Sequence, residues 1–436
     1  MASTEKPHFD TAIVGAGFGG LCMAIALKQA GRRSLVILEK EADAGGTWLV
    51  NRYPGCACDV PSHLYSYSFE PNPRWSRAYS PQPEIHRYVR ACVDKYALAE
   101  HIRFNTELTR AEYDSGTGLW RLHTAGGETL TARTLVGALG FLNIPAMPAV
   151  PGIDTFAGPS FHSRYWDTDC DLDGKRVAVI GTGASAIQFV PKIAARAKSL
   201  TLFQRTPPWV LPKPDRRLTA VEHWLYSRLP LVQRALRTGI YWALEGLAIP
   251  FIRKPSAMKL FERIGRWQLR RQVPDPALRD KLAPSYRLGC KRILFSNDYY
   301  PALTRPGVSV ETSAIEAINE RGVRTADGVQ HDVDVIVYGT GFKAVDPVPR
   351  GLIIGSGGQD IVDAWKDGPE AYLGTAVSGF PNLFFIIGPN TGLGHSSMLF
   401  MIESQVAYIT EAIASLSNAG ARAIELKAAV QKRYNA

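Results

Sequence analysis

Two glycine-rich segments have the residue types and the spacing that bind a pyrophosphate. The first, Gly15-Ala16-Gly17-Phe18-Gly19-Gly20, follows an apolar run and precedes a helical pattern. In such a turn Gly15 permits the tight bend, Gly17 lets the backbone approach a pyrophosphate, and Gly20 lets helix and strand pack closely. The N–H groups at the start of the helix then face the phosphates. Glu39, at the end of the next apolar run, can accept hydrogen bonds from ribose hydroxyls.

The second segment, Gly181-Thr182-Gly183-Ala184-Ser185-Ala186, repeats this pattern with alanine in place of the last glycine, which the fingerprint tolerates. Arg205 stands as far from Gly181 as Glu39 stands from Gly15. A guanidinium at this position suits a 2′-phosphate, whereas a carboxylate suits a free ribose diol. The sequence therefore predicts an FAD site followed by an NADPH site. The predicted NADPH-binding residues of this unit are Gly181, Gly183, Ser185, Arg205 and Thr206.

Strand and helix patterns surround both turns. In the first unit we expect strands at 9–14 and 34–39 and a helix at 21–30 that ends at Gly31. In the second we expect strands at 176–180 and 199–204 with a helix reaching about residue 197. The predicted fold class is α/β, with two Rossmann-like dinucleotide-binding domains.

A segment between about residues 215 and 284 has a different composition, rich in aromatic residues and arginine and helical in pattern. We interpret it as a helical insertion in the NADPH domain, where it walls the substrate pocket. Its basic, amphipathic character also permits a weak contact with a membrane surface, although a packed helical subdomain is the simpler interpretation.

Three further segments resemble one family. Gly45-Gly46-Thr47-Trp48 is followed by Tyr53-Pro54-Gly55 and Asp59, and residues 156–167 fit the pattern Phe-x-Gly-x3-His-x3-Trp-Asp at every fixed position. The third segment is Gly289-Cys290-Lys291-Arg292. Together they resemble the signatures of the type I Baeyer–Villiger monooxygenases, flavoenzymes that insert oxygen beside a ketone carbonyl.

Part of this resemblance has an independent physical basis. Gly46 and the glycine before it let the backbone lie against a flat ring system, and Trp48 and Tyr53 supply aromatic walls. Asp59, among small and apolar neighbours, is a candidate pocket acid, with an ordinary turn aspartate as the alternative. His162, surrounded by aromatic residues, could be a base, but a structural role in an interdomain joint is favoured.

The resemblance implies roles for the remaining residues. Lys291 would help to hold the 2′-phosphate, and Arg292 would sit over the flavin, positioned by Asp59; a solvated basic pair is the alternative. NADPH would reduce FAD, and a flavin C4a-peroxide formed with O2 would attack a ketone carbonyl to give an ester or lactone. Arg292 and Asp59 are the predicted catalytic residues. The predicted FAD-binding residues are Gly15, Gly17, Gly20, Glu39, Gly46, Thr47, Trp48, Tyr53 and Asp59, with Gly388 and Asn390 on a flavin-side loop.

The resemblance also implies a discontinuous FAD domain. It places the FAD-binding domain at 1–144 and 345–436, the NADPH-binding domain at 145–214 and 285–344, and the helical insertion at 215–284.

Two other functions remain open at this point: an N- or S-oxygenating flavin monooxygenase, and a non-catalytic NADPH-binding partner protein. The complete ending Trp166-Asp167 favours the Baeyer–Villiger group. A disulfide reductase would need a redox cysteine pair, and the sequence has no Cys-x-x-Cys spacing.

Composition sets the remaining expectations. The chain has 436 residues, 46% of them hydrophobic, and a net charge of +10. Its basic residues are not gathered in one tail, so we expect no nucleic-acid partner. The family resemblance implies a small-molecule ketone and O2 as partners. Six scattered cysteines without metal-type spacing indicate a reducing cytoplasm and no metal site. The sequence does not indicate an oligomeric state.

Overall fold

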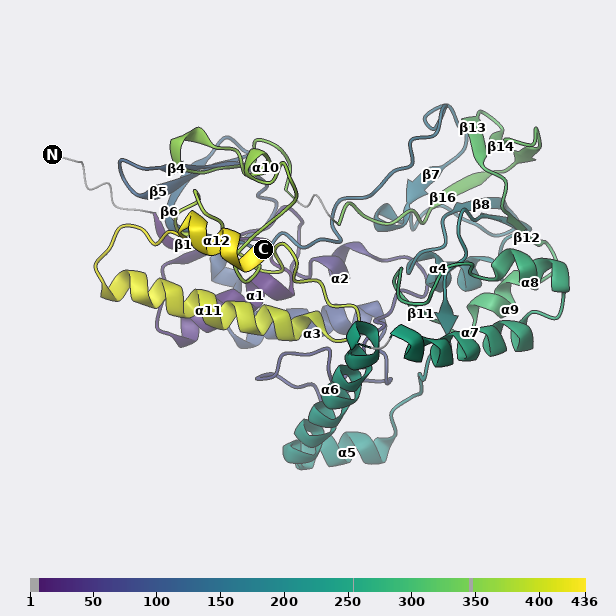
Figure 1. The fold of residues 1–436 in the computed structure, drawn as a ribbon, viewed down its shortest axis with the longest axis horizontal. Helices are drawn as coiled ribbons and strands as arrows, with labels where there is room; N and C mark the ends of the chain where they lie inside the picture. The colour runs from purple at the N-terminus through teal and green to yellow at the C-terminus, as the bar shows by residue number, and fades with distance from the viewer. Residues whose placement is uncertain (1–7, 254, 345–347) are drawn as a thin grey trace.

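Two sheets, one from each nucleotide unit, form the frame of the molecule. The computed structural model describes residues 8–253, 255–344 and 348–436. Figure 1 shows the two sheets toward opposite ends of the longest axis, with helices below and between them. This α/β arrangement of two Rossmann-like domains confirms the predicted fold class.

The first sheet has the order β17-β4-β5-β6-β1-β2-β3, and β18 also pairs with β6. The central strand β1 is parallel to both β2 and β6, whereas β4, β5 and β6 are joined antiparallel. Its strands are β1 (Phe9–Val14), β2 (Leu35–Leu38), β3 (Ile102–Arg103), β4 (Leu108–Asp114), β5 (Leu119–Thr124), β6 (Thr129–Gly137), β17 (Ile353–Ile354) and β18 (Leu383–Phe385). Because β17 and β18 return to this sheet after the second sheet is complete, the first domain is discontinuous in sequence.

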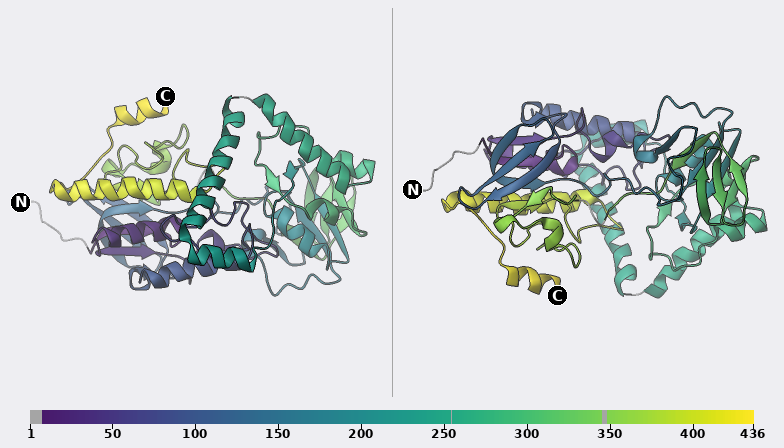
Figure 2. Two further views of the ribbon diagram at one scale, coloured as in Figure 1. Left: turned by 90° about the horizontal axis from the view of Figure 1, so that it is seen from below. Right: turned by 90° about the horizontal axis from the view of Figure 1, so that it is seen from above.

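Helices accompany the first sheet, and the long α11 packs along α1 (Figure 2). These helices are α1 (Phe18–Gln29), α2 (Thr47–Val50), α3 (Gln82–Lys95), α10 (Ile361–Ala364), α11 (Met398–Asn418) and α12 (Ala428–Asn435). Helix α1 begins three residues earlier than predicted, directly after the glycine turn. Gly31 then has a φ of +76°, the left-handed conformation that follows many helix ends.

The second sheet has the order β12-β9-β8-β16-β7, and all of its strands are parallel. They are β7 (Ser160–His162), β8 (Arg176–Ile180), β9 (Ser199–Phe203), β12 (Val308–Glu311) and β16 (Val335–Tyr338). Its helices are α4 (Ala186–Ile193) and α9 (Tyr299–Leu303). The predicted second helix is shorter than expected, because α4 ends at Ile193, although the helix continues through Pro191.

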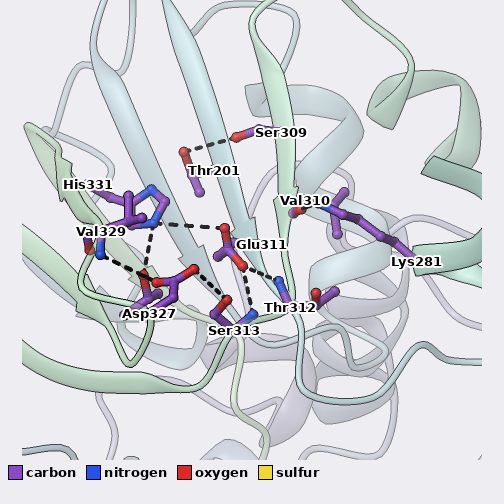
Figure 3. A network of polar contacts seen from close by, with 11 residues as sticks. Thr201, Lys281, Ser309, Val310, Glu311, Thr312, Ser313, Asp327, Val329 and His331 are labelled. Carbon is purple, nitrogen blue, oxygen red and sulfur yellow. Dashed lines mark hydrogen bonds and ion pairs between the residues drawn. The ribbon is translucent and has the colours of Figure 1, made fainter. Parts of the chain in front are cut away.

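Two small sheets border the second domain. The parallel pair β10 (Val210–Leu211) and β11 (Leu294–Phe295) brackets the helical insertion. The antiparallel strands β13 (Ile315–Asn319), β14 (Gly322–Thr325) and β15 (Gln330–Asp332) follow β12. Figure 3 shows the polar contacts that tie them to it: Glu311 accepts from the N–H of Ser313, and Ser313 Oγ donates to Asp327. His331 lies within ion-pair distance of Glu311, so the hairpin is fixed to the sheet edge.

The helical insertion consists of α5 (Ala220–Arg228), α6 (Pro230–Arg253), α7 (Met258–Gln272) and α8 (Pro276–Leu282). Helix α6 reaches the first domain through side chains spaced four residues apart. Gln233 donates to Asn72 O, and the buried Arg237 donates to the carbonyls of residues 63, 64 and 66. Glu245 lies 3.2 Å from His395 Nε2. The insertion therefore connects the two domains; the exact division at residues 144, 214, 284 and 344 remains a proposal.

Candidate active site

A cavity of about 540 Å³ opens between the two domains. Residues of both glycine turns border it, together with most of residues 45–60 and Arg292. Of the predicted site residues, it is lined by Gly15, Gly17, Glu39, Gly46, Thr47, Trp48, Tyr53, Asp59, Gly183, Ser185 and Arg292. The structure thus brings both predicted catalytic residues and part of each predicted nucleotide site to one cavity.

The first glycine has a similar backbone conformation in the two turns. The φ angles of Gly15 and Gly181 are +103° and +108°, a region that favours glycine. A Cβ atom at Gly15 would lie 2.6 Å from Ala138 O, and one at Gly181 would lie 2.4 Å from Gly339 O. Both positions therefore require glycine for conformation and for space.

The third position of each turn explains a difference between the units. A Cβ atom at Gly20 would lie 1.9 Å from Gly15 O, so helix and strand could not approach this closely with any side chain. In the second unit Ala186 occupies the equivalent place and is fully buried. Room for it comes from Gly339, because a Cβ atom there would lie 3.2 Å from the Ala186 Cβ.

Glu39 lies at the carboxyl end of β2, as predicted for a ribose-binding acid. Its Oε2 accepts from the N–H of Ala16 at 2.6 Å, and its Oε1 accepts from the N–H of Glu41 at 2.9 Å. Burial raises the pKa of this carboxyl, against the lowering effect of the two N–H donors. The carboxylate is therefore held rigidly at the cavity edge with lone pairs left for a diol.

The segment after α1 and β2 supplies aromatic walls. Gly46 has a φ of +53° and faces Gly17, with a Cβ atom at Gly46 only 3.0 Å from the Gly17 Cα. The buried Trp48 donates from Nε1 to Tyr65 Oη at 3.0 Å. Tyr53 is also buried, and its hydroxyl donates to Gln188 Oε1 of α4 at 3.1 Å. This wall is therefore fixed by contacts from both domains.

The two predicted catalytic residues, Asp59 and Arg292, meet across the domain interface. Arg292 Nη2 donates to Asp59 Oδ2 at 2.6 Å. Arg292 precedes β11, whereas Asp59 belongs to the wall segment of the first domain. The charge of Asp59 raises the pKa of Arg292, and the hydrogen bond adds to this effect. The Arg292 side chain is 51% exposed, because it faces the open cavity.

The other predicted residues do not line the cavity. Arg205 and Lys291 are exposed, and Lys291 Nζ lies 5.1 Å from the ring centre of Tyr286. Thr206 O accepts from Thr182 Oγ1 at 3.1 Å, which fixes the end of β9 to the glycine turn. Their roles toward a 2′-phosphate remain proposals.

Two more predicted residues shape the backbone of the flavin-side loop. A Cβ atom at Gly388 would lie 2.4 Å from Gly374 O, and Asn390 has a φ of +61°. Contact of these two residues with a flavin remains a proposal.

Three residues stabilise the site through contacts that the sequence did not predict. Gln188 bonds both Tyr53 and the backbone of Ala57, which ties α4 to the wall segment. Lys213 Nζ donates to Cys58 O at 3.2 Å, directly beside Asp59, and burial lowers its pKa. Arg164, buried in the resembled motif, donates to Glu41 Oε1 at 2.9 Å and to Asn143 Oδ1. Each contact joins residues distant in sequence, so only the fold reveals it.

His162 makes a structural contact, in line with the structural role that the sequence favoured over a role as a base. Its Nδ1 accepts from the N–H of Arg164 at 3.1 Å, and the ring is buried beside Phe342. The ring therefore stabilises the segment that carries Arg164.

The residues present fit two dinucleotides. The N-cap residues of α1 and α4 are Gly17 and Ser185, and neither side chain caps the first N–H groups of its helix. Such uncapped N–H groups at a glycine turn are where a pyrophosphate binds. The turns leave space for a backbone-to-phosphate approach that a side chain would fill. That the first turn and the wall segment hold FAD and that the second turn holds NADPH remains a proposal.

The two cysteines that line this cavity do not suit disulfide chemistry. Cys56 and Cys58 line the cavity but are free and buried. Burial raises the pKa of Cys56 to about 12 and that of Cys58 still further. Because the thiolate is the reactive form, both thiols are inert at neutral pH.

Fold and site together define a two-nucleotide flavoenzyme. The family model described as "Pyridine nucleotide-disulphide oxidoreductase" matches residues 12–241. The crystal structure of OTEMO in complex with FAD and NADP superposes with a TM-score of 0.87 at 30% identity, covering 99% of this chain and 90% of that one.

The relatives narrow the class further. A Baeyer-Villiger monooxygenase of Pseudomonas aeruginosa is 51% identical over 428 residues, which cover 98% of this chain and 81% of that protein. An epsilon-caprolactone-bound cyclohexanone monooxygenase superposes with a TM-score of 0.88 at 31% identity, covering 98% of this chain and 91% of that one. The chain belongs to the Baeyer–Villiger monooxygenase family.

The close packing at Gly20 predicts a specific loss of FAD. In Gly20→Ala the new methyl group would overlap Gly15 O and displace the turn, so the purified variant should retain little FAD. Gly239→Ala is the matched control, because nothing lies within 4 Å of the added Cβ in α6 and alanine favours a helix. The measurement is FAD released on heat denaturation per mole of protein. Equal FAD in both variants would show that the first turn does not hold the cofactor.

Proposed function

We propose that this protein is an FAD- and NADPH-dependent monooxygenase that inserts one atom of O2 beside a ketone carbonyl to give an ester or lactone. The observation that carries the proposal is the Asp59–Arg292 ion pair, placed in the cavity that both nucleotide turns border. Membership of the Baeyer–Villiger family supports ketones over the alternative N- or S-containing substrates. The intact cavity likewise favours an enzyme over a non-catalytic NADPH-binding protein.

The residues of the chain bind the cofactors, orient the reacting groups and stabilise the charge that develops on the substrate. Bound FAD, reduced by NADPH, supplies the chemistry that activates O2. Arg292 presents a fixed positive charge to the cavity and stabilises the negative charge that develops on the substrate's carbonyl oxygen. Asp59 positions the guanidinium, and Lys213 holds the Cys58 carbonyl next to Asp59. The aromatic walls at Trp48 and Tyr53 exclude water from the reacting groups.

NADPH selectivity is assigned to Arg205 and Lys291. Arg205 follows β9 in the place where the first unit has Glu39 after β2, so the two sites differ in charge at equivalent positions. Both cations are exposed and therefore accessible to a 2′-phosphate.

The setting of the enzyme is also a proposal. All six cysteines are free, as expected in a reducing cytoplasm. Within the described residues, no helix is long and apolar enough to cross a membrane. We also propose the weak contact of the helical insertion with a membrane surface that its basic, amphipathic sequence permits.

The proposed activity is tested with purified protein, NADPH, a cyclic ketone and isotopically labelled dioxygen. We expect an ester or lactone that contains one labelled oxygen atom, with NADPH consumption that rises when ketone is added. NADPH oxidation without any oxygenated product from a panel of ketones, amines and sulfides would contradict the proposal. Product from amines or sulfides alone would support the N- or S-oxygenating alternative.

Arg205→Ala should weaken the binding of NADPH and leave the binding of NADH nearly unchanged. A hydrogen bond to a charged group contributes about 1.5–3 kcal/mol, so losing about 2 kcal/mol raises the Michaelis constant for NADPH about 30-fold. NADH kinetics should change little. The exposed Arg196, which pairs with Asp173, provides a control as Arg196→Ala. If the Michaelis constant for NADH rose as much as that for NADPH, Arg205 would have a structural role instead.

Arg292→Ala should separate oxygenation from cofactor binding. The variant should keep FAD but lose oxygenated product about 100- to 1000-fold, as expected when a preorganised donor to an oxyanion is removed. Any remaining NADPH oxidation should end in hydrogen peroxide. Arg292→Lys should rescue poorly, because a point charge on a flexible stem does not reproduce a planar fork. The measurement is product per NADPH consumed, with the exposed Arg287→Ala as control; normal yield in Arg292→Ala would remove this residue from the mechanism.

A further inference from the structure

Exposed apolar side chains gather on the helical insertion. More than half of the exposed large apolar residues in the described chain lie between residues 221 and 267. Three tryptophans are among them: Trp224, Trp242 and Trp267 are 61%, 65% and 54% exposed. Scattered apolar residues on a surface need no explanation, but a concentration on one segment marks an interaction surface.

The same segment carries most of the chain's excess positive charge. Residues 215–284 contain 14 Lys and Arg against 6 Asp and Glu, a net charge of +8 out of +10 for the whole protein. Two of the acids, Glu245 and Asp215, pair with His395 and Arg77 outside the insertion, whereas Glu222 pairs with Arg216 inside it. The insertion therefore has a strongly positive net charge.

Helix α7 shows how the apolar and basic groups are combined. Leu260, Ile264, Trp267 and Arg271 recur at helical spacing, so they form one exposed stripe. The guanidinium of Arg271 lies 5.3 Å from the ring centre of Trp267.

Basic residues border this stripe, and the only acid of α7 points away from it. Lys259, Arg263 and Arg270 are exposed along the helix. Glu262 instead accepts from the N–H of Leu288 at 3.2 Å, and its side chain is 14% exposed. The outward face of α7 is therefore apolar and cationic.

The position of these helices leaves them accessible. Figure 1 shows α5 and α6 projecting at the lower edge of the molecule, and Figure 2 (left) shows α5, α6 and α7 across the face seen from below.

We propose that α5, α6 and α7 dock on a membrane surface that contains anionic lipid. Tryptophan and leucine beside arginine are the residues of helices that lie in the lipid interface, with apolar groups among the acyl chains and cations at the headgroups. The proposal extends the membrane contact of the proposed function to a lipid class and to named residues. It does not depend on the oxygenation chemistry.

The combination of positive charge and apolar side chains favours an anionic membrane over a second copy of the chain or a nucleic acid. A second copy of the chain would bring a like-charged patch against the first, which is unfavourable. A nucleic acid would pair with the arginines but would leave Leu260, Ile264 and Trp267 without apolar contacts. An anionic lipid surface satisfies both kinds of side chain at once.

Vesicle sedimentation tests the proposal with the FAD-loaded enzyme. We expect binding to vesicles of phosphatidylcholine mixed with phosphatidylglycerol, little binding to phosphatidylcholine alone, and weakening by salt. Each arginine near an anionic surface contributes about 5-fold in affinity. The double variant Arg263→Gln/Arg270→Gln should therefore bind about 25-fold more weakly.

The control Arg33→Gln/Arg87→Gln removes the same charge from exposed sites in the first domain and should bind normally. NADPH oxidation should be unchanged in both double variants, which shows that they are folded and separates this test from that of the proposed function.

A third variant addresses the apolar stripe. Trp267→Ser should also weaken binding to the mixed vesicles while keeping NADPH oxidation. Equal binding to both vesicle types, no binding to either, or equal loss in the two double variants would overturn the proposal. So would a dimer that Trp267→Ser dissociates, because the stripe would then belong to a second copy.

Discussion

The ion pair between Asp59 and Arg292 links the two halves of the cavity, and the arrangement of both domains follows from the need to form it. Asp59 comes from a wall segment that starts after β2, and Arg292 comes from the segment before β11, beyond the helical insertion. Their contact at 2.6 Å requires that the domains meet in one orientation. Arg164 with Glu41, Gln188 with Tyr53, and the side chains of α6 all join the same two domains.

Space at the glycine turns is the second constraint. Gly15 and Gly181 adopt nearly identical φ angles, although the turns are proposed to bind different dinucleotides. The exchange of a glycine for Ala186 is accommodated by Gly339 on the neighbouring segment. The two units thus satisfy the same backbone requirement with different residues. The charge at the end of the second strand is the proposed basis for their different ligands.

Local features of the site could be predicted from the sequence, because they depend on short spacings. The glycine turns, the strands at β1 and β8, and the position of Glu39 follow from patterns within about one βαβ unit. Features that depend on contacts between distant residues could not be predicted from the sequence. Nothing near Lys213 or Gln188 in the sequence indicates that they support the wall segment, since their partners lie far away in the chain. Helix α4 also ends earlier than its pattern suggested.

The central claim is that Asp59 and Arg292 act as one unit, and a double-mutant cycle measures this directly. The quantity is kcat/KM for a ketone in Asp59→Asn, Arg292→Gln, the double variant and the unchanged enzyme. If Asp59 acts through Arg292, the double variant should be no more than about 3-fold slower than the slower single variant. Losses that multiply in the double variant would show two independent residues and contradict the account.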